Sequence, residues 1–223
     1  MSYTSHADLG GQAGYGAVVP EPEGELFHAA WEPRALALSL AMGATGSWNI
    51  DIGRSARETL PDYARLSYYE IWTSALQRLL EERHLADTDE IEAGHMLRRG
   101  PPVKRVLHAG EVQAVLAGGS PTLRPSTDSP RFDLGQRVRT MSTVADHHTR
   151  LPEYVRGREG VIQRIHGAHI FADTNAQGLG EQPQFLYTVV FAGTELWSES
   201  GGARDCQSLT VSVDAWESYL EPV

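Results

Sequence analysis

A loop rich in histidine and arginine is the stretch of this chain best suited to chemistry. It runs from His147 to Gly160 and carries two imidazoles and three guanidiniums in a protein whose net charge is −10. Pro152 fixes the backbone within the loop, and Gly160 leads into a segment with the pattern of a strand. Forked guanidiniums on a rigid loop suit the recognition of fixed oxyanions. The alternative is a solvated loop, because most runs of surface charge are only that.

A second group of polar and aromatic residues falls on two expected helices. Arg54 and Glu58 are four residues apart and share a helix face. Tyr68, Tyr69 and Trp72 cluster on the first turns of the next helix. These groups make sense as the lining of a pocket whose reactive centre comes from another chain. The alternatives are a simple ion pair for Arg54 and core packing for Trp72.

The chain offers no clear metal site or nucleophile of its own. Among its nine histidines, His166 and His169 flank Gly167-Ala168, which predicts a turn. His147 and His148 are adjacent, so on an extended chain their side chains would point in opposite directions. The single cysteine, Cys206, excludes an internal disulfide and a thiolate cluster, and no Gly-x-Ser-x-Gly elbow is present. We therefore expect no metal to be bound by this chain alone.

Composition narrows the class of protein. The 223 residues allow one large or two small domains. The negative net charge argues against nucleic acid as the main partner. The sequence shows neither the basic, apolar start of a signal peptide nor an apolar run of about 18–20 residues that could span a membrane. We expect a cytoplasmic protein that binds neither nucleic acid nor membrane.

The chain divides by composition into four segments. Residues 1–34 are rich in Gly and Pro but contain Leu26, Phe27 and Trp31, so we expect an extended arm that wraps a partner subunit. Residues 35–117 have helical periodicity, and residues 118–130 have the composition of a linker. Residues 131–223 alternate with the period of strands.

Local signals place the elements within these segments. An Ala/Leu run at 35–42, a helix at 51–60 capped by Asp51, and a weaker helix at 111–117 are expected. Ser67 with Glu70 and Asp87 with Glu90 have the spacing of capping boxes that begin two further helices. Short strands are expected at 132–140, 160–165, 185–191 and 209–213. The predicted fold class is α+β, with a helical N-terminal domain followed by a small SH3-like β-barrel.

Motifs along nearly the whole chain resemble the β subunit of nitrile hydratase. The first, His6 to Gly16, combines a His, an Asp and a Gly-Gly pair with a following Gly-Tyr-Gly. The others, in chain order, are Phe27-His28, Trp31-Glu32, Trp48–Asp51, Ser67–Trp72, His148–Pro152, Tyr154–Gly157, Gly178–Gln184, Leu186–Val189, Glu195–Trp197, Val213-Asp214 and Tyr219–Pro222. Each motif is short, but so many in the same order are specific.

The resemblance implies an enzyme that hydrates nitriles to amides and is active only with an α subunit, often as an (αβ)2 heterotetramer. The α subunit of the family holds Co(III) or Fe(III) through a cysteine cluster in which two sulfurs are oxidised to sulfinate and sulfenate. This chain has no such cluster, which fits the β role. General similarity favours cobalt slightly.

The resemblance also implies roles for particular residues. The family's two β-subunit arginines bind the oxygens of the oxidised cysteines, and they align with Arg54 and Arg150. Glu58 and His148 fall where the family has groups that orient the arginines or tune a proton path. Tyr68 would donate a hydrogen bond to the substrate or its imidate intermediate. The implied substrate pocket contains Ile50, Gly53, Tyr69 and Trp72.

Three positions depart from the family pattern. Glu153 stands where many relatives carry a base, which alters the charge of the loop. Ile71 replaces a histidine found in some relatives, so a proton relay at that position is in doubt here. Gly53 is smaller than the residue often found there and predicts a roomier pocket.

Three other functions fit parts of the sequence. A thiocyanate hydrolase-type subunit would perform the same chemistry on S–C≡N, but there the two halves of this chain occur as separate subunits. A metallochaperone that matures the α subunit would resemble the N-terminal half only. A non-catalytic SH3-like interaction module predicts no loss of catalysis when Arg54 or Arg150 is changed.

Overall fold

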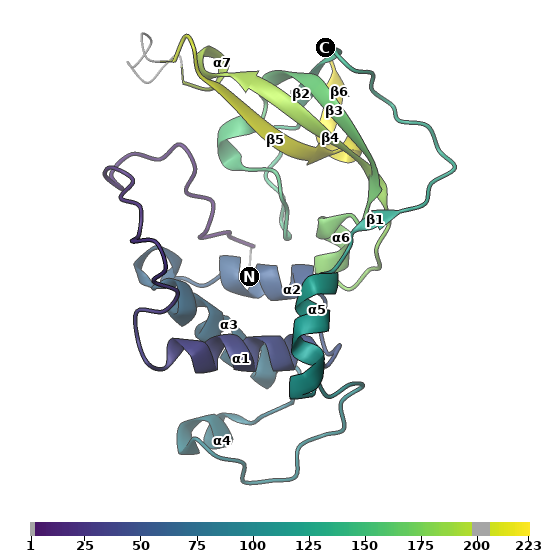
Figure 1. Ribbon diagram of the computed structural model, residues 1–223. Coiled ribbons are helices and arrows are strands. Elements are labelled where there is room, and N and C mark those ends of the chain that lie inside the picture. Colours follow the sequence, from purple (N-terminus) through teal and green to yellow (C-terminus); the bar gives the residue numbers. More distant parts are fainter. Residues whose placement is uncertain (1–2, 198–205) are drawn as a thin grey trace. The chain divides into compact units, whose positions relative to one another are not determined.

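The computed structural model describes residues 3–197 and 206–223, which form two compact units. One unit comprises Thr4–Gly119, and the other comprises Ser120–Val223 together with Tyr3. Helices dominate the first unit and an antiparallel sheet dominates the second (Figure 1). The α+β class is therefore confirmed. Within the described residues, no helix is long and apolar enough to cross a membrane.

The segment before the first helix is extended and exposes apolar side chains. Residues 4–31 contain turns and bends but neither helix nor strand. Val18 and Leu26 are 94% and 77% exposed, and Tyr15 is also exposed. An isolated folded unit gains nothing from leaving such side chains in water. That the arm wraps a partner stays a prediction.

Five α-helices among the described residues build the first unit. They are α1 (Glu32–Gly43), α2 (Ile50–Glu58), α3 (Tyr68–Glu82), α4 (Thr88–Ala93) and α5 (Val112–Gly118), with 3-10 turns at Tyr63–Arg65 and Ala109–Glu111. Both predicted capping boxes are confirmed: Ser67 with Glu70 begins α3, and Asp87 begins α4. Helices α2 and α3 pack on each other through Ala56, Leu60, Ala75 and Leu79.

The predicted N-cap of α2 was wrong by two residues. Asn49, not Asp51, is the N-cap, and its side-chain oxygen accepts a 2.8 Å hydrogen bond from the backbone N–H of Ile52. Asn49 has the extended backbone typical of a cap, whereas Asp51 already lies inside the helix. Asp51 is thereby released to face the interior, where it is 4% exposed.

Six strands in the described part of the second unit form one sheet in which all the pairings are antiparallel. They are β1 (Leu123–Arg124), β2 (Arg137–Thr140), β3 (Glu159–His169), β4 (Gln184–Ala192), β5 (Thr210–Trp216) and β6 (Leu220–Pro222). The order is β5-β4-β3-β2-β6, with β1 also paired to β3 (Figure 1). Short helices interrupt them: η3 (Glu153–Val155), α6 (Ala172–Ala176), α7 (Gly193–Trp197) and η5 (Glu217–Tyr219). Strand β1 lies inside the segment with linker composition. Closure of the sheet into an SH3-like barrel stays a prediction.

Strand β3 corrects the prediction of a turn between His166 and His169. The strand continues to His169, and its pairing with β4 shifts register between Ile165 and Gly167. Gly167 has φ +93°, so it accommodates this bulge without ending the strand. The sequence signal was therefore real but marked an irregularity within a strand.

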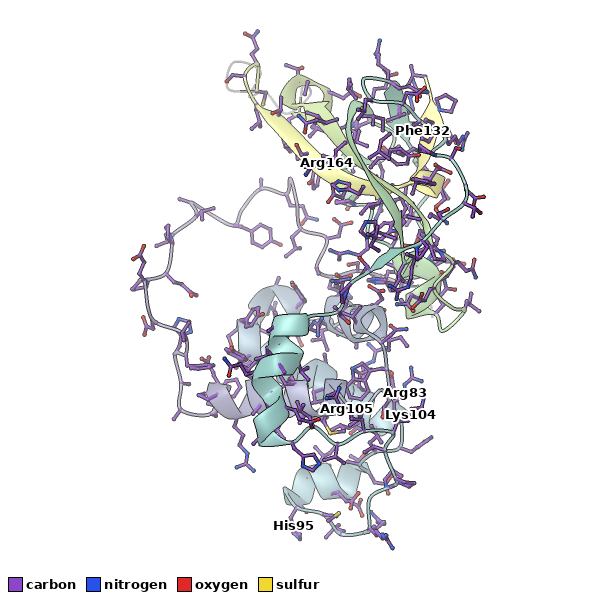
Figure 2. The ribbon with its side chains drawn as sticks, turned by 45° about the vertical axis from the view of Figure 1, so that its right-hand side comes forward. Arg83, His95, Lys104, Arg105, Phe132 and Arg164 are labelled. Carbon is purple, nitrogen blue, oxygen red and sulfur yellow. The ribbon has the colours of Figure 1, made fainter. Side chains whose placement is uncertain are left out.

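The core of the sheet unit is aromatic and aliphatic. Phe132, labelled in Figure 2, is 1% exposed, and its ring meets that of Tyr187 edge-on at 5.7 Å. At the start of β3, a Cβ added to Gly160 would lie 2.5 Å from Cγ1 of Val189 and 2.9 Å from the carbonyl oxygen of Val190. Strands β3 and β4 can therefore pack this closely only because residue 160 has no side chain.

Candidate functional site

Arg54 is held on α2 by a buried carboxylate. Its Nη1 donates a 2.8 Å hydrogen bond to Oδ1 of Asp51, three residues earlier on the same helix. The Asp51 side chain is 6% exposed and the Arg54 side chain 32% exposed. The guanidinium is thus anchored on its protein side while part of it reaches the surface. Arg54 pairs here with Asp51, at a spacing of three residues, in addition to sharing a face with Glu58.

Arg57, which sequence reasoning did not single out, belongs to the same group. Its guanidinium carbon lies 4.7 Å from the centre of the Trp72 ring, in cation–π geometry. Burial lowers the pKa of Arg57, and the positive charge of Arg54 lowers it further. Arg57 comes three residues after Arg54 on one helix, and this spacing could have pointed to it.

The aromatic cluster expected at the start of α3 is present. The Tyr68 ring lies 5.1 Å from Tyr69 and 5.6 Å from Trp72, measured between ring centres. Phe27 of the arm meets Tyr69 at 5.6 Å. Tyr68 is 63% exposed. Partial burial raises the pKa of Tyr69, with smaller contributions from Tyr68 and Glu32.

Two further residues of the implied pocket lie on α2. Ile50 begins the helix and is 46% exposed, whereas Gly53 is buried. A Cβ added to Gly53 would lie 3.5 Å from the Trp48 ring, an ordinary contact distance. The space beside Gly53 is therefore bounded by Trp48, and a roomier pocket stays a prediction.

The loop between β2 and β3 is held by internal hydrogen bonds. Nε and Nη2 of Arg156 both donate to the carbonyl oxygen of Leu151, at 3.3 and 3.1 Å. Thr140 donates a short hydrogen bond from its hydroxyl to the carbonyl of Val155. Two of the guanidinium donors expected to recognise a ligand are thus used within the loop itself.

In this loop His148 is buried, whereas Arg150 is partly exposed. His148 is 2% exposed, and its Nδ1 lies 3.2 Å from the hydroxyl of Tyr3. His147, in contrast, is partly exposed. The backbone N–H of Arg150 donates a 3.1 Å hydrogen bond to the hydroxyl of Tyr219.

Asp173 on α6 is a buried carboxyl group of the sheet unit with a raised pKa. It is 3% exposed and accepts a short hydrogen bond from the Tyr219 hydroxyl. Burial raises its pKa to about 6, against the opposing effects of Tyr219, His147 and Thr149. No sequence motif marked Asp173. It lies shortly before Gly178-Leu179-Gly180, but at no spacing that is typical of a functional motif.

The predicted site residues therefore fall into two groups. Arg54, Glu58, Ile50, Gly53, Tyr68, Tyr69 and Trp72 lie on α2 and the first turns of α3, in the helical unit. His148 and Arg150 lie on the loop of the sheet unit. Among the described residues, no group of three or more His, Cys, Asp or Glu side chains could hold a metal ion.

Both halves of the chain match models of one known protein family. The family model "Nitrile hydratase beta subunit, N-terminal" matches residues 3–115, and "Nitrile hydratase beta subunit, C-terminal" matches residues 121–222. The chain belongs to the nitrile hydratase β-subunit family. It is thus a component of nitrile hydratase, an enzyme.

Two cobalt-containing relatives match this chain over nearly its full length, and a third protein matches part of it. The low-molecular weight cobalt-containing nitrile hydratase subunit beta of Rhodococcus rhodochrous is 36% identical over 96% of this chain and 97% of its own length. The cobalt-containing nitrile hydratase subunit beta of Pseudonocardia thermophila is 31% identical over 97% of this chain and 95% of its own. Thiocyanate hydrolase subunit alpha of Thiobacillus thioparus is 32% identical, but over only 41% of this chain and 71% of its own length.

Proposed function

We propose that this β subunit acts with an α subunit, as an αβ pair or (αβ)2 heterotetramer, to hydrate nitriles to amides. Arg54 and Arg150 bind the oxygens of oxidised cysteine ligands in the α subunit, and Glu58 and His148 orient them. The observation that carries the proposal is the match to both β-subunit family models from residue 3 to residue 222. The intact chain also favours this function over the thiocyanate hydrolase type, whose matched subunit corresponds to 41% of it.

The metal belongs to the partner in this proposal. The described residues contain no ligand cluster, whereas the exposed part of Arg54 can donate hydrogen bonds to anionic oxygens. When bound in the α subunit, the metal would act as a Lewis acid toward the nitrile. Two relatives are named as cobalt-containing, so we propose Co(III) rather than Fe(III).

The chain's own residues supply binding and charge compensation. Planar guanidiniums can hold two oxygens at once, which fixes the partner's oxidised ligands in one orientation. Tyr68 is 63% exposed, so its hydroxyl can donate a hydrogen bond to the substrate or to its imidate intermediate. Trp72 and Tyr69 provide the apolar wall of the pocket, with Ile50 and Gly53 at its edge.

The arm is proposed to wrap the α subunit. Its support is the exposure of Val18, Val19 and Leu26 in a segment without helix or strand. Apolar side chains of this size are stabilised by burial against another surface. The sheet is proposed to close as an SH3-like barrel, which would present the Arg150 loop on a rigid frame.

Lysine variants of the arginines test this function. The tagged chain is co-expressed with the α subunit, and cobalt, iron and amide release from a simple nitrile are measured. We expect Arg54→Lys and Arg150→Lys each to co-purify with a metal-loaded partner but to lose turnover by about 10- to 100-fold, because lysine cannot hold two oxygens in one plane. Arg65→Lys, at an exposed helical position, is the control. Normal turnover in both variants would support an interaction module instead, and a chain that binds no partner would remove the β-subunit role.

A further inference from the structure

The Tyr219 hydroxyl joins the Arg150 loop to helix α6. It accepts hydrogen bonds from the Thr149 hydroxyl at 3.0 Å and from the Arg150 backbone N–H at 3.1 Å. It donates its own proton to the carboxylate of Asp173. A phenolic hydroxyl has one donor and two acceptor positions, so all of them are used. Tyr219 is 2% exposed, so these hydrogen bonds lie in the interior of the sheet unit.

Asp173 contacts the same loop a second time. Its Oδ2 lies 3.7 Å from Nδ1 of His147, and that nitrogen is 2.9 Å from the carbonyl oxygen of His148. The buried carboxylate of Asp173 thus contacts both the Tyr219 hydroxyl, which binds Arg150, and the imidazole of His147. Burial raises the pKa of Asp173 to about 6, so the carboxylate is ionised at neutral pH in spite of its burial. A buried charge is tolerated only where polar partners surround it.

We propose that Asp173 and Tyr219 are positioning residues of nitrile hydration: they fix the backbone of Thr149 and Arg150, and through it the Arg150 guanidinium. The inference rests on the proposed function of Arg150. The position of a side chain depends on the position of the backbone that carries it. A displacement of about 1 Å at a reacting centre can lower the rate about 100-fold. Tyr219 and Asp173 are 2% and 3% exposed, so in this proposal they act through Arg150 rather than by touching the substrate.

The sheet unit contains a matched control for Tyr219. Tyr187 on β4 is also fully buried, and its hydroxyl accepts a 3.0 Å hydrogen bond from the backbone N–H of Arg131. It donates a 2.5 Å hydrogen bond to Glu217. Tyr187 therefore holds a backbone N–H and a carboxylate as Tyr219 does, but at Arg131 rather than at Arg150. Phenylalanine at either position keeps the packed ring.

The test compares Tyr219→Phe with Tyr187→Phe in the αβ holoenzyme. Both should lower the melting temperature, since each removes buried hydrogen bonds. We expect kcat to fall about 10- to 100-fold in Tyr219→Phe only, with KM changed less than kcat and metal content preserved. Asp173→Asn, whose amide oxygen can still accept from Tyr219, should retain more turnover than Asp173→Ala. Equal kcat in the two phenylalanine variants would overturn the proposal.

A double variant separates this inference from the function on which it rests. If Tyr219 acts through Arg150, its effect on kcat should largely vanish in an Arg150→Lys background. If the reductions in kcat of the two single variants multiply in the double variant, the positioning role of Tyr219 is overturned, while the proposed function of Arg150 stands. Full turnover in Arg150→Lys itself would instead overturn the proposed function of Arg150, and the positioning role with it.

Discussion

Arg54 and Arg150 are fixed by different physical means. Arg54 is held by its own side chain, which pairs with buried Asp51 at 2.8 Å within one helix. Arg150 is held by its backbone N–H, through the hydroxyl of Tyr219. A change near Arg54 should therefore act directly on the guanidinium, whereas a change near Arg150 should act on the loop.

Asp51→Asn tests the first case. The amide keeps the size of the side chain but removes the charge that attracts Arg54, so we expect a loss of about 1–3 kcal/mol in the free energy of unfolding and lower turnover. Thermal melts and amide release from the co-expressed pair measure the two effects. Asp62→Asn is the control, because Asp62 and Arg65 have the same spacing at 4.0 Å but are exposed. Equal stability and turnover in the two variants would contradict an anchoring role for Asp51.

The sequence predicted the arginines but not the carboxylates that hold them. Arg54 follows the motif Trp48–Asp51 by three residues and Arg150 lies within His148–Pro152, so both could be proposed from the resemblance. Asp51 was interpreted as the cap of a helix through Leu60, but Asn49 takes that role, and its side chain accepts from the backbone N–H of Ile52. Asp173 meets Tyr219 across 46 residues of sequence, and no local pattern records such a contact.

At the scale of elements, local sequence rules predicted where helices begin better than they predicted irregularities within strands. The capping boxes of α3 and α4 are decided within four residues, so they could be read directly. The bulge at Gly167 depends on how β3 pairs with β4, which the sequence of one strand does not specify. A glycine that predicts a turn from local sequence can therefore instead form a bulge within a paired strand.

Gly160 gives a testable consequence of strand pairing. Because a new Cβ would lie 2.5 Å from Val189 Cγ1 and 2.9 Å from the Val190 carbonyl oxygen, Gly160→Ala must displace β3 or β4. We expect a loss of roughly 1–3 kcal/mol in the free energy of unfolding, measured by urea denaturation of the purified complex. Gly110→Ala, where nothing lies within 4 Å, should change stability much less. A stable Gly160→Ala variant would show that the strands can separate without cost.

At the scale of the whole molecule, stability should depend on pH through Asp173. Its pKa in the folded protein, about 6, lies above the ordinary value of 3.8, so the folded state binds more protons between these values. Its contribution to the free energy of unfolding should therefore fall as the pH rises from about 4 to about 6, by roughly 3 kcal/mol, and stay constant above. His147, Tyr219 and Thr149 surround the group. The melting temperature of the wild type relative to Asp173→Asn measures this, and a constant difference across that window would contradict it.

Burial of the arm by a partner makes a prediction for the complex. Residues 4–31 expose large apolar side chains and also Glu21, Glu23 and Glu25. A glutamate-specific protease should therefore cut the isolated chain first within this segment, because exposed backbone outside helices and strands is readily cleaved. In the αβ complex the same bonds should be protected, while cleavage in the exposed region around Glu92, on α4, proceeds at a similar rate and serves as the internal control. Sites that are cut equally fast with and without the α subunit would show that the arm does not pack on it.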